Sequence, residues 1–261
     1  LLLCCMVLGL LPTTAFAAGK IWVGTEEALL AALADNTIDK ITLTADITVS
    51  QTLVIDRQVV LVLDHSLKVD WEQSSSGTLF HITKSGYLDT NAGSITDNVL
   101  NEGKFFPRQI SGEVINEGEI IRGSFSGKGK NRGSINYGSF RGEVENAPGG
   151  KIANGELYGE VTNHGEIAGW KFYGKVTNEA DGIISYGKFY GDVVNNGTIT
   201  GGSFFGTLTG SEIQDNAYIA VTFADGDSTV AVQRILRGQK AQRPAAPTKD
   251  GYTFIGWDNK A

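Results

Sequence analysis

The sequence predicts an all-β protein: a parallel β-solenoid (β-helix) with a short capping helix at its N-terminal end and a smaller module after it. Two observations predict the solenoid. Of the 261 residues, 34 are glycine and only 5 are proline, which indicates many tight turns between short elements. Apolar residues also recur every 15 or 17 positions between about 86 and 210, which is typical of a chain built from stacked repeats.

Residues 1–17 form an apolar run that is too short to span a bilayer and closes with an Ala-x-Ala pattern at Ala15 and Ala17. We expect a signal peptide, truncated at its start, because the initiating Met and a basic segment are missing from it. Its removal takes away Cys4 and Cys5, the only cysteines of the chain. We therefore expect an exported protein without disulfides or thiolate metal sites, and one that does not span a membrane in its mature form.

Residues 18–84 are expected to form a cap and the first coils. Thr25 precedes two acidic residues and a helical spacing of apolar ones, which predicts a short helix with Thr25 as its N-cap. Apolar and polar residues then alternate over 41–49, 53–56 and 59–69, which predicts strands. The helix followed by "DKITLTADITV" and "VVLVLDHSL" resembles the opening of pectate-lyase-like right-handed parallel β-helix proteins of bacterial surfaces, a resemblance that we extend over about 20–215.

Residues 85–215 are expected to form coils with three inward apolar positions each, which become a core only when the coils stack. A bulky residue recurs at Ile110, Phe125, Phe140, Leu157, Phe172, Phe189 and Phe204. Five positions before it stand Phe105, Ile120, Ile135, Ile152, Ile167, Ile184 and Ile199. Four positions after most of them stand Val114, Val144, Val161, Val176, Val193 and Leu208, with Gly129 as the one gap.

Glycine and asparagine recur at the corners between these strands. One glycine follows the bulky position by two residues and another precedes the Ile column by two, from which we expect left-handed backbone without room for Cβ. Asparagines occupy a third corner, where we expect a structural ladder of stacked amides; they are Asn116, Asn131, Asn146, Asn163, Asn178 and Asn195. The 17-residue coils carry their extra residues after Asn146 and Asn178.

Outward aromatic residues are the candidate binding site. Tyr158, Tyr173, Tyr190 and Phe205 directly follow the bulky column, and we expect a ladder of rings at the ~4.8 Å strand spacing. Trp170 and Tyr186, with Tyr137, are expected to extend it as an aromatic patch on the adjoining corner. Such a surface suits a sugar or a protein partner. The alternative is that the rings only stabilise neighbouring strands.

Other partners and chemistries have weaker support. The net charge of −7 argues against nucleic acid. The outward column Glu113, Lys128, Glu143, Glu160, Lys175 and Asp192 is interpreted as solvated salt bridges. No catalytic, cofactor or metal site is expected, because His81 and His164 stand alone and the pairs Asp64 with His65 and Asp89 with Asp97 fit surface turns better than an acid cluster.

Residues 219–261 lack the solenoid period. The string "VTF…V…GQ…P.AP.K.GYTF.GW" resembles the internalin-type B repeat, also called the Listeria-Bacteroides repeat. This resemblance implies a small β-grasp-like extracellular module, usually in tandem on cell-wall proteins of Gram-positive bacteria. Its residues Gly251, Tyr252, Phe254, Gly256 and Trp257 are interpreted as packing and turn positions. The module looks truncated at Ala261, so further repeats or a wall anchor are expected beyond it.

The functional prediction is therefore a secreted or cell-wall-associated surface protein with an adhesin-like role, binding polysaccharide or a host surface protein. Two alternatives remain open. One is a structural spacer that binds nothing. The other is a polysaccharide-active enzyme, since parallel β-helices also house lyases and hydrolases.

Overall fold

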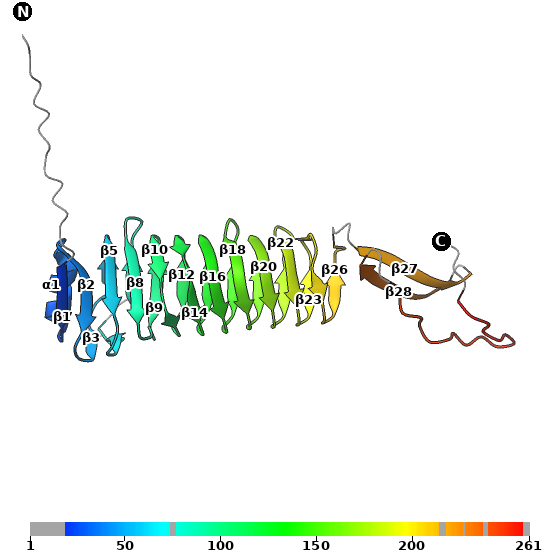
Figure 1. The fold of residues 1–261 in the computed structure, drawn as a ribbon, viewed down its shortest axis with the longest axis horizontal. Helices are drawn as coiled ribbons and strands as arrows, with labels where there is room; N and C mark the ends of the chain where they lie inside the picture. Colours follow the sequence, from blue (N-terminus) through cyan, green and yellow to red (C-terminus); the bar gives the residue numbers. More distant parts are fainter. Residues whose placement is uncertain (1–18, 74–76, 214–217, 227, 237–239, 258–261) are drawn as a thin grey trace, which may run out of the picture.

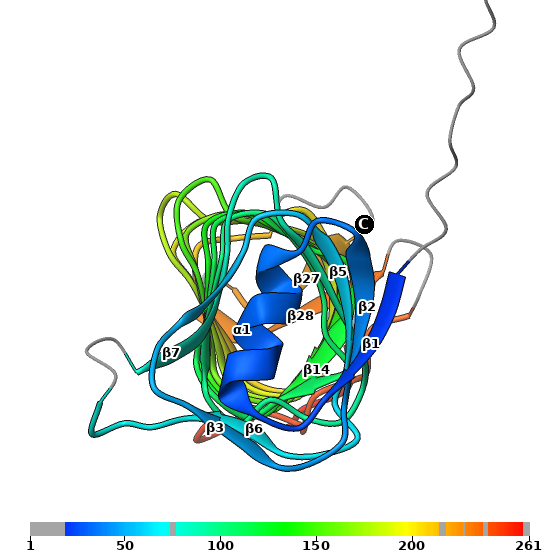
Figure 2. The ribbon, with the colours of Figure 1, turned by 90° about the vertical axis from the view of Figure 1, so that its left-hand side faces the viewer.

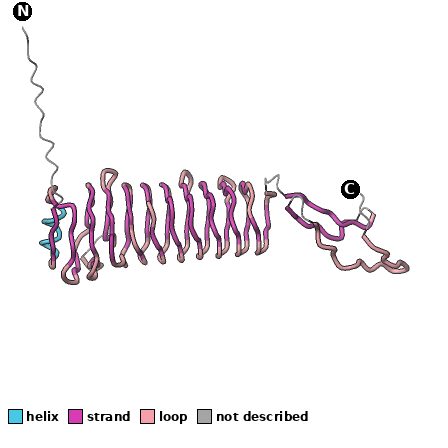
Figure 3. Tube along the Cα trace, in the orientation of Figure 1, coloured by secondary structure: helices cyan, strands magenta, loops and turns pink. Residues whose placement is uncertain are grey.

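A computed structural model describes residues 19–73, 77–213, 218–226, 228–236 and 240–257. The signal peptide predicted over 1–17 lies outside these residues. The described chain is nearly all β: a row of stacked coils with one helix at its N-terminal end and an antiparallel hairpin after its last coil (Figures 1 and 3). This arrangement confirms the predicted parallel β-solenoid.

Two long parallel sheets form the walls of the solenoid, and a short pair of strands adds to them near the N-terminus. The 14-stranded sheet contains β1 (Gly19–Val23), β2 (Ile38–Leu43), β5 (Gln58–Val62), β8 (Tyr87–Ala92), β10 (Lys104–Phe106), β11 (Gln109–Ile110), β13 (Glu119–Ile120), β14 (Gly123–Phe125), β16 (Ser134–Phe140), β18 (Lys151–Leu157), β20 (Glu166–Phe172), β22 (Ile183–Phe189), β24 (Thr198–Ile199) and β25 (Ser203–Phe204). The 10-stranded sheet contains β4 (Leu53–Ile55), β7 (Thr78–Ile82), β9 (Asn98–Asn101), β12 (Val114–Asn116), β15 (Gly129–Asn131), β17 (Val144–Asn146), β19 (Val161–Asn163), β21 (Val176–Asn178), β23 (Val193–Asn195) and β26 (Leu208–Gly210). The short pair is β3 (Ile47–Val49) with β6 (Leu67–Val69).

The predicted N-terminal helix is confirmed as α1 (Glu26–Ala34), which lies across the end of the solenoid (Figure 2). The Thr25 hydroxyl accepts a 3.2 Å hydrogen bond from the Ala28 amide, as an N-cap does. At the other end, the Arg57 guanidinium donates to the carbonyls of Ala32 and Leu33, both at 3.1 Å. Since Leu29 is buried against the first coils, the helix covers apolar surface that would otherwise face water.

The three predicted apolar columns face the inside of the coils, where each residue pairs in register with its counterpart on the next coil. Their residues are buried except Phe204 and Leu208 in the last coil, which are half-buried. Inward phenylalanines stack ring on ring: Phe125 and Phe140 are 4.3 Å apart, and Phe172 and Phe189 are 4.6 Å apart. The register survives the 17-residue coils. Ile135 still pairs with Ile152 across an insertion, so the added residues stay at one corner, as the sequence predicts.

The asparagine ladder is also confirmed, and it begins one coil earlier than predicted. All its side chains are buried, and each amide nitrogen donates to the amide oxygen of the next asparagine at 2.6–2.9 Å. The first donor is Asn101, whose own oxygen has no partner among the described residues. At the other end, Asn195 donates to the carbonyl of Ser211 at 3.1 Å.

The corner positions require glycine for a different reason from the one predicted. None in the two predicted columns has a positive φ, so the expectation of left-handed backbone was wrong. The expectation that Cβ has no room is right. A Cβ on Gly142 would collide with the carbonyl oxygen of Gly127 on the preceding coil, and Gly159 stands in the same relation to Gly142. Close stacking of one backbone on another therefore requires glycine here.

After the solenoid, β27 (Tyr218–Asp225) and β28 (Ser228–Leu236) form an antiparallel pair. The indole of Trp257 meets the Phe223 ring edge-on at 5.0 Å, which confirms a packing role for this residue of the repeat. Within the described residues, no helix has the length and apolar character needed to cross a membrane.

Candidate functional site

The predicted aromatic ladder is present on the outside of the solenoid. The rings of Tyr158 and Tyr173 lie 4.6 Å apart, those of Tyr173 and Tyr190 4.9 Å, and those of Tyr190 and Phe205 4.9 Å, each pair within 8° of parallel. These residues follow β18, β20, β22 and β25, so the parallel register of the strands sets the spacing of the rings. The ladder is a rigid strip along the solenoid axis.

Stacking determines which part of each ring a partner can reach. Tyr173 and Tyr190 have a neighbouring ring on both faces, and the Arg141 guanidinium lies 5.6 Å from the ring of Tyr158 on its outer side. The tyrosines are nevertheless 38–42% exposed, whereas Phe205 at the end is 66% exposed. The ladder therefore presents ring edges and hydroxyl groups, and the open ring face belongs to Phe205.

A polar network borders the ladder. Glu156 accepts a 2.7 Å hydrogen bond from the Tyr158 hydroxyl and a 2.9 Å hydrogen bond from the Lys171 ammonium group. These two donors lower the pKa of the Glu156 carboxyl below its usual value, with Lys171 as the larger cause. The same carboxylate raises the pKa of Lys171. One edge of the ladder thus carries fixed charges beside an apolar strip.

Trp170 does not belong to this surface, so the prediction of an outward Trp170 was wrong. Its side chain is 1% exposed and lies inside the coil, over Gly155, with its ring centre 6.0 Å from that of Phe140. The physical reason is volume. The bulky column has Leu157 where its neighbours have phenylalanine, and the indole fills the space that the smaller side chain leaves.

Tyr186 is outward as predicted, 60% exposed, but it stands apart from the ladder stack. Its backbone has φ of 63°, the left-handed region, and it is the only described residue other than glycine with a positive φ. The equivalent position on the preceding coil is Gly169, with φ of 75°. A side chain held in this conformation carries a backbone cost of about 1 kcal/mol or more.

The predicted column of outward charged residues forms fewer ion pairs than a continuous ladder of salt bridges would. Of the predicted outward charge column, the described residues show one ion pair, Lys128 with Glu143 at 2.7 Å. Other pairs join adjacent coils elsewhere, such as Lys130 with Glu145 at 2.7 Å. His81 and His164 are not isolated, contrary to prediction, because carboxylates of the next coil lie within reach. His81 contacts Glu102 at 2.7 Å, and His164 contacts Asp181 at 3.0 Å.

The residues considered as catalytic pairs, Asp64 with His65 and Asp89 with Asp97, include both exposed and buried side chains. His65 lies 3.6 Å from Asp46 in an exposed position. Asp97 is buried and does not lie in a surface turn, contrary to prediction; its carboxylate accepts hydrogen bonds of 3.0 Å from the Val69 amide and the Trp71 indole. Within the part of the chain that the structure describes, no three His, Cys, Asp or Glu side chains gather as metal ligands would.

Comparison with known proteins identifies the C-terminal part of the chain. Residues 220–261 match the family of the Listeria-Bacteroides repeat domain. No curated protein and no solved structure matched the chain. The repeat is typical of bacterial surface proteins, which is consistent with a surface role for this chain, and it confirms the family resemblance of residues 219–261.

Proposed function

We propose that this chain is an exported, wall-associated bacterial protein with an adhesin-like role, and that the aromatic ladder of Tyr158, Tyr173, Tyr190 and Phe205 is its contact surface for a protein on an opposing cell. The observation that carries the proposal is the geometry of the ladder. The four rings are parallel and 4.6–4.9 Å apart; the three tyrosines expose edges and hydroxyls while their faces are largely closed, and Phe205 ends the stack.

Tyrosine edges and hydroxyls suit protein surfaces. Tyrosine supplies a large amphipathic contact area at a low entropy cost, and it is enriched at protein interfaces. In the ladder that cost is lower still, because stacking already holds each ring in place. The Glu156 and Lys171 pair beside the strip supplies polar groups of the kind found at an interface rim.

The test is binding of the fluorescently labelled chain to intact epithelial cells, followed by flow cytometry. We expect the triple variant Tyr158→Ala, Tyr173→Ala, Tyr190→Ala to bind at least tenfold more weakly, as for interface hot spots. A matched control removes three exposed aromatic side chains outside the ladder, Trp22, Tyr186 and Tyr252, and should bind normally. Protease treatment of the cells should abolish binding. Undiminished binding of the ladder variant would refute the proposal.

Glycan binding is the second candidate, and the open face of Phe205 favours it. This ring ends the stack and is 66% exposed, so one sugar ring can pack on it. On a glycan array, Phe205→Ala should then lose binding that the triple tyrosine variant retains. Loss of cell binding after glycosidase treatment, rather than after protease treatment, would favour this candidate.

A further inference from the structure

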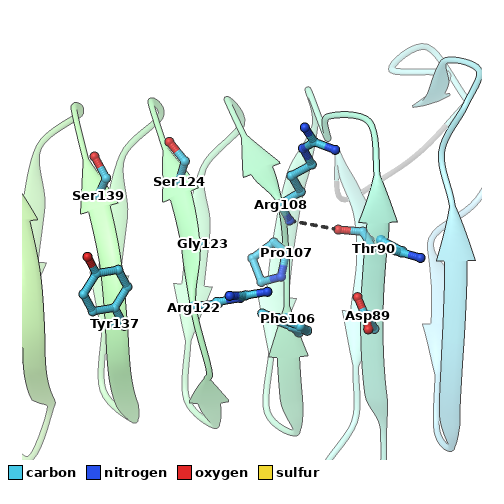
Figure 4. A pocket seen from close by; sticks show the side chains of 11 residues that line it. Asp89, Thr90, Phe106, Pro107, Arg108, Arg122, Gly123, Ser124, Tyr137 and Ser139 are labelled. Atoms are coloured by element: carbon cyan, nitrogen blue, oxygen red, sulfur yellow. Dashed lines mark hydrogen bonds between the residues drawn. The ribbon is translucent and has the colours of Figure 1, made fainter.

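A row of residues runs beside the aromatic ladder and carries charge on only three coils. It consists of the residue directly before the bulky column on each coil, and we call it the flanking row. From the second coil of that column onward its members are Ser124, Ser139, Glu156, Lys171, Lys188 and Ser203, each in register with the next. Figure 4 shows the first two serines at equivalent places on neighbouring strands, at the border of a surface pocket. The three charged members lie on the coils whose ladder residue is a tyrosine.

The first of these coils shows how the ladder holds a carboxylate. One oxygen of Glu156 accepts a 2.7 Å hydrogen bond from the hydroxyl of Tyr158, and the other accepts a 2.9 Å hydrogen bond from the ammonium group of Lys171. The tyrosine belongs to the same coil as the glutamate, and the lysine belongs to the next coil. A carboxylate therefore fits between a ladder hydroxyl and the flanking-row lysine that follows it.

The next coil repeats the two donors without the carboxylate. Tyr173 corresponds to Tyr158, and Lys188 corresponds to Lys171, each one repeat later and in register. The position equivalent to Glu156 is Lys171, whose ammonium group is directed to Glu156 on the preceding coil. In the described part of the chain, neither the Tyr173 hydroxyl nor the Lys188 ammonium group has a hydrogen-bond or ion-pair partner. Two hydrogen-bond donors therefore stand where the preceding coil binds a carboxylate.

This edge of the ladder has an excess of positive charge, although the chain has a net charge of −7. Lys171 and Lys188 pair in register on adjacent strands, an unfavourable arrangement of like charges. Glu156 forms an ion pair with Lys171 alone. Glu156 is also the main cause of the raised pKa of Lys171, and Tyr173 and Tyr190 add to it, so both tyrosines lie close to the row. An anionic hydrogen-bond acceptor would satisfy all of these groups at once.

The opposite edge of the ladder has a different charge pattern. Glu160, Lys175 and Asp192 occupy equivalent positions there on successive coils, so each positive charge lies between two negative ones. The Asp192 carboxylate also accepts a 2.9 Å hydrogen bond from the Thr207 amide. The excess of positive charge is therefore confined to the edge that carries Lys188.

We propose that Tyr173 and Lys188, with Tyr190 beside them, bind the carboxylate of an aspartate or glutamate side chain on the protein partner. The inference rests on the ladder contact proposed above and specifies the chemistry of the partner at that contact. One oxygen of the carboxylate accepts from the Tyr173 hydroxyl and the other from the Lys188 ammonium group. A hydrogen bond to a charged group is stronger than a neutral one, so this contact gives the ladder a preference for acidic segments.

The first test is calorimetric titration of the intact chain with decaglutamate and with decaglutamine, its uncharged counterpart. We expect decaglutamate to bind, decaglutamine to bind at least tenfold more weakly, and Lys188→Ala to lose at least tenfold for decaglutamate. Tyr173→Phe keeps the ring and removes the donor, so it should lose about threefold. The matched control Lys128→Ala removes a cation that is paired with Glu143 away from the ladder, and it should bind normally. Circular dichroism checks that each variant is folded.

The second test is the cell-binding measurement described above, with the same variants. Lys188→Ala should bind the cells at least tenfold more weakly, and Lys128→Ala should bind them normally. Loss of binding by the triple ladder variant but not by Lys188→Ala would overturn the acidic partner and leave the ladder contact standing, whereas normal binding of both would overturn both. Equal affinity for decaglutamate and decaglutamine, or an unchanged affinity of Lys188→Ala for decaglutamate, would also overturn the inference. Loss of cell binding after sialidase rather than protease treatment would place the carboxylate on a sugar and contradict a protein side chain.

Discussion

The side-chain nitrogen of Asn146 donates a 2.8 Å hydrogen bond to the side-chain oxygen of Asn163 on the next coil, and both side chains are fully buried. Each inner asparagine of the ladder gives one such bond and receives another. Removing Asn163 therefore leaves the side-chain oxygen of Asn178 without its donor, and it takes from the side-chain nitrogen of Asn146 one of its three acceptors. The ladder fixes the register of the coils in a way that apolar packing alone does not.

Replacing an inner asparagine should be more damaging than replacing the first. We expect Asn163→Ala to lower the free energy of unfolding by about 2–4 kcal/mol, since two buried polar groups lose partners. Asn101→Ala should cost less, because the side-chain oxygen of Asn101 already lacks a partner among the described residues. Chemical denaturation measures both. Equal losses would show that the ladder adds nothing beyond each residue's local contacts.

The corner glycines should respond to close approach rather than to backbone dihedral angle. Gly142→Ala places a Cβ against the carbonyl of Gly127, whereas Gly149, with φ of 83°, has nothing within 4 Å of an added Cβ. We expect Gly149→Ala to cost about 1 kcal/mol and Gly142→Ala to cost more, because two backbones must separate. Thermal unfolding followed by circular dichroism ranks the two variants. The reverse order would contradict the explanation by close approach.

Leu157 and Trp170 should behave as one packing unit. Trp170→Gly alone should cost about 3–5 kcal/mol through a cavity, and Leu157→Phe alone about 1–3 kcal/mol through overpacking. The double variant restores the phenylalanine and glycine of the neighbouring coils, so its cost should be clearly below the sum. A double-mutant cycle from denaturant midpoints measures this coupling. Additive costs would mean that the indole does not fill the space beside Leu157.

The Glu156 carboxyl should titrate below the usual range of a glutamate. Lys171 and the Tyr158 hydroxyl favour its charged form, so the folded state binds this proton more weakly than the unfolded state does. Its contribution to stability is therefore present above the usual glutamate pKa and is lost as the pH falls through the lowered one. Side-chain NMR titration measures the midpoint. Lys171→Met should raise it, and an unchanged midpoint would contradict the contact.

The sequence was sufficient to predict the solenoid because its core is periodic. Residues such as Phe125 and Phe140 occupy equivalent positions in successive coils, and a parallel register places equivalent positions on top of one another. The outward ladder follows from the same rule. Tyr173 and Tyr190 are adjacent in space because they are one repeat apart in sequence, so their contact needs no knowledge of side-chain conformation.

The predictions from the sequence that were wrong or missing mostly concern residues that depart from the repeat. Trp170 occupies a position that is glycine in the neighbouring coils. Its side chain points inward because Leu157 on the adjacent coil is smaller than the phenylalanine at the equivalent position of other coils, and this comparison of volumes involves two coils. The contact of the Arg122 guanidinium with the Phe106 ring, at 4.5 Å, depends on a side-chain rotamer that the spacing of residues does not predict. The positions of the corner glycines and the lack of room for a Cβ were predicted correctly, and the left-handed backbone was predicted wrongly, since the spacing of residues does not distinguish a dihedral angle from a close approach.

The most direct test of the proposed ladder contact is tyrosine-specific iodination of the chain, free and bound to epithelial cells, with the modified residues located by mass spectrometry. The proposal predicts that Tyr158, Tyr173 and Tyr190 are protected in the bound chain, while Tyr186, which is exposed outside the ladder, is iodinated equally in both states. Equal iodination of the ladder tyrosines in the free and the bound chain would contradict it.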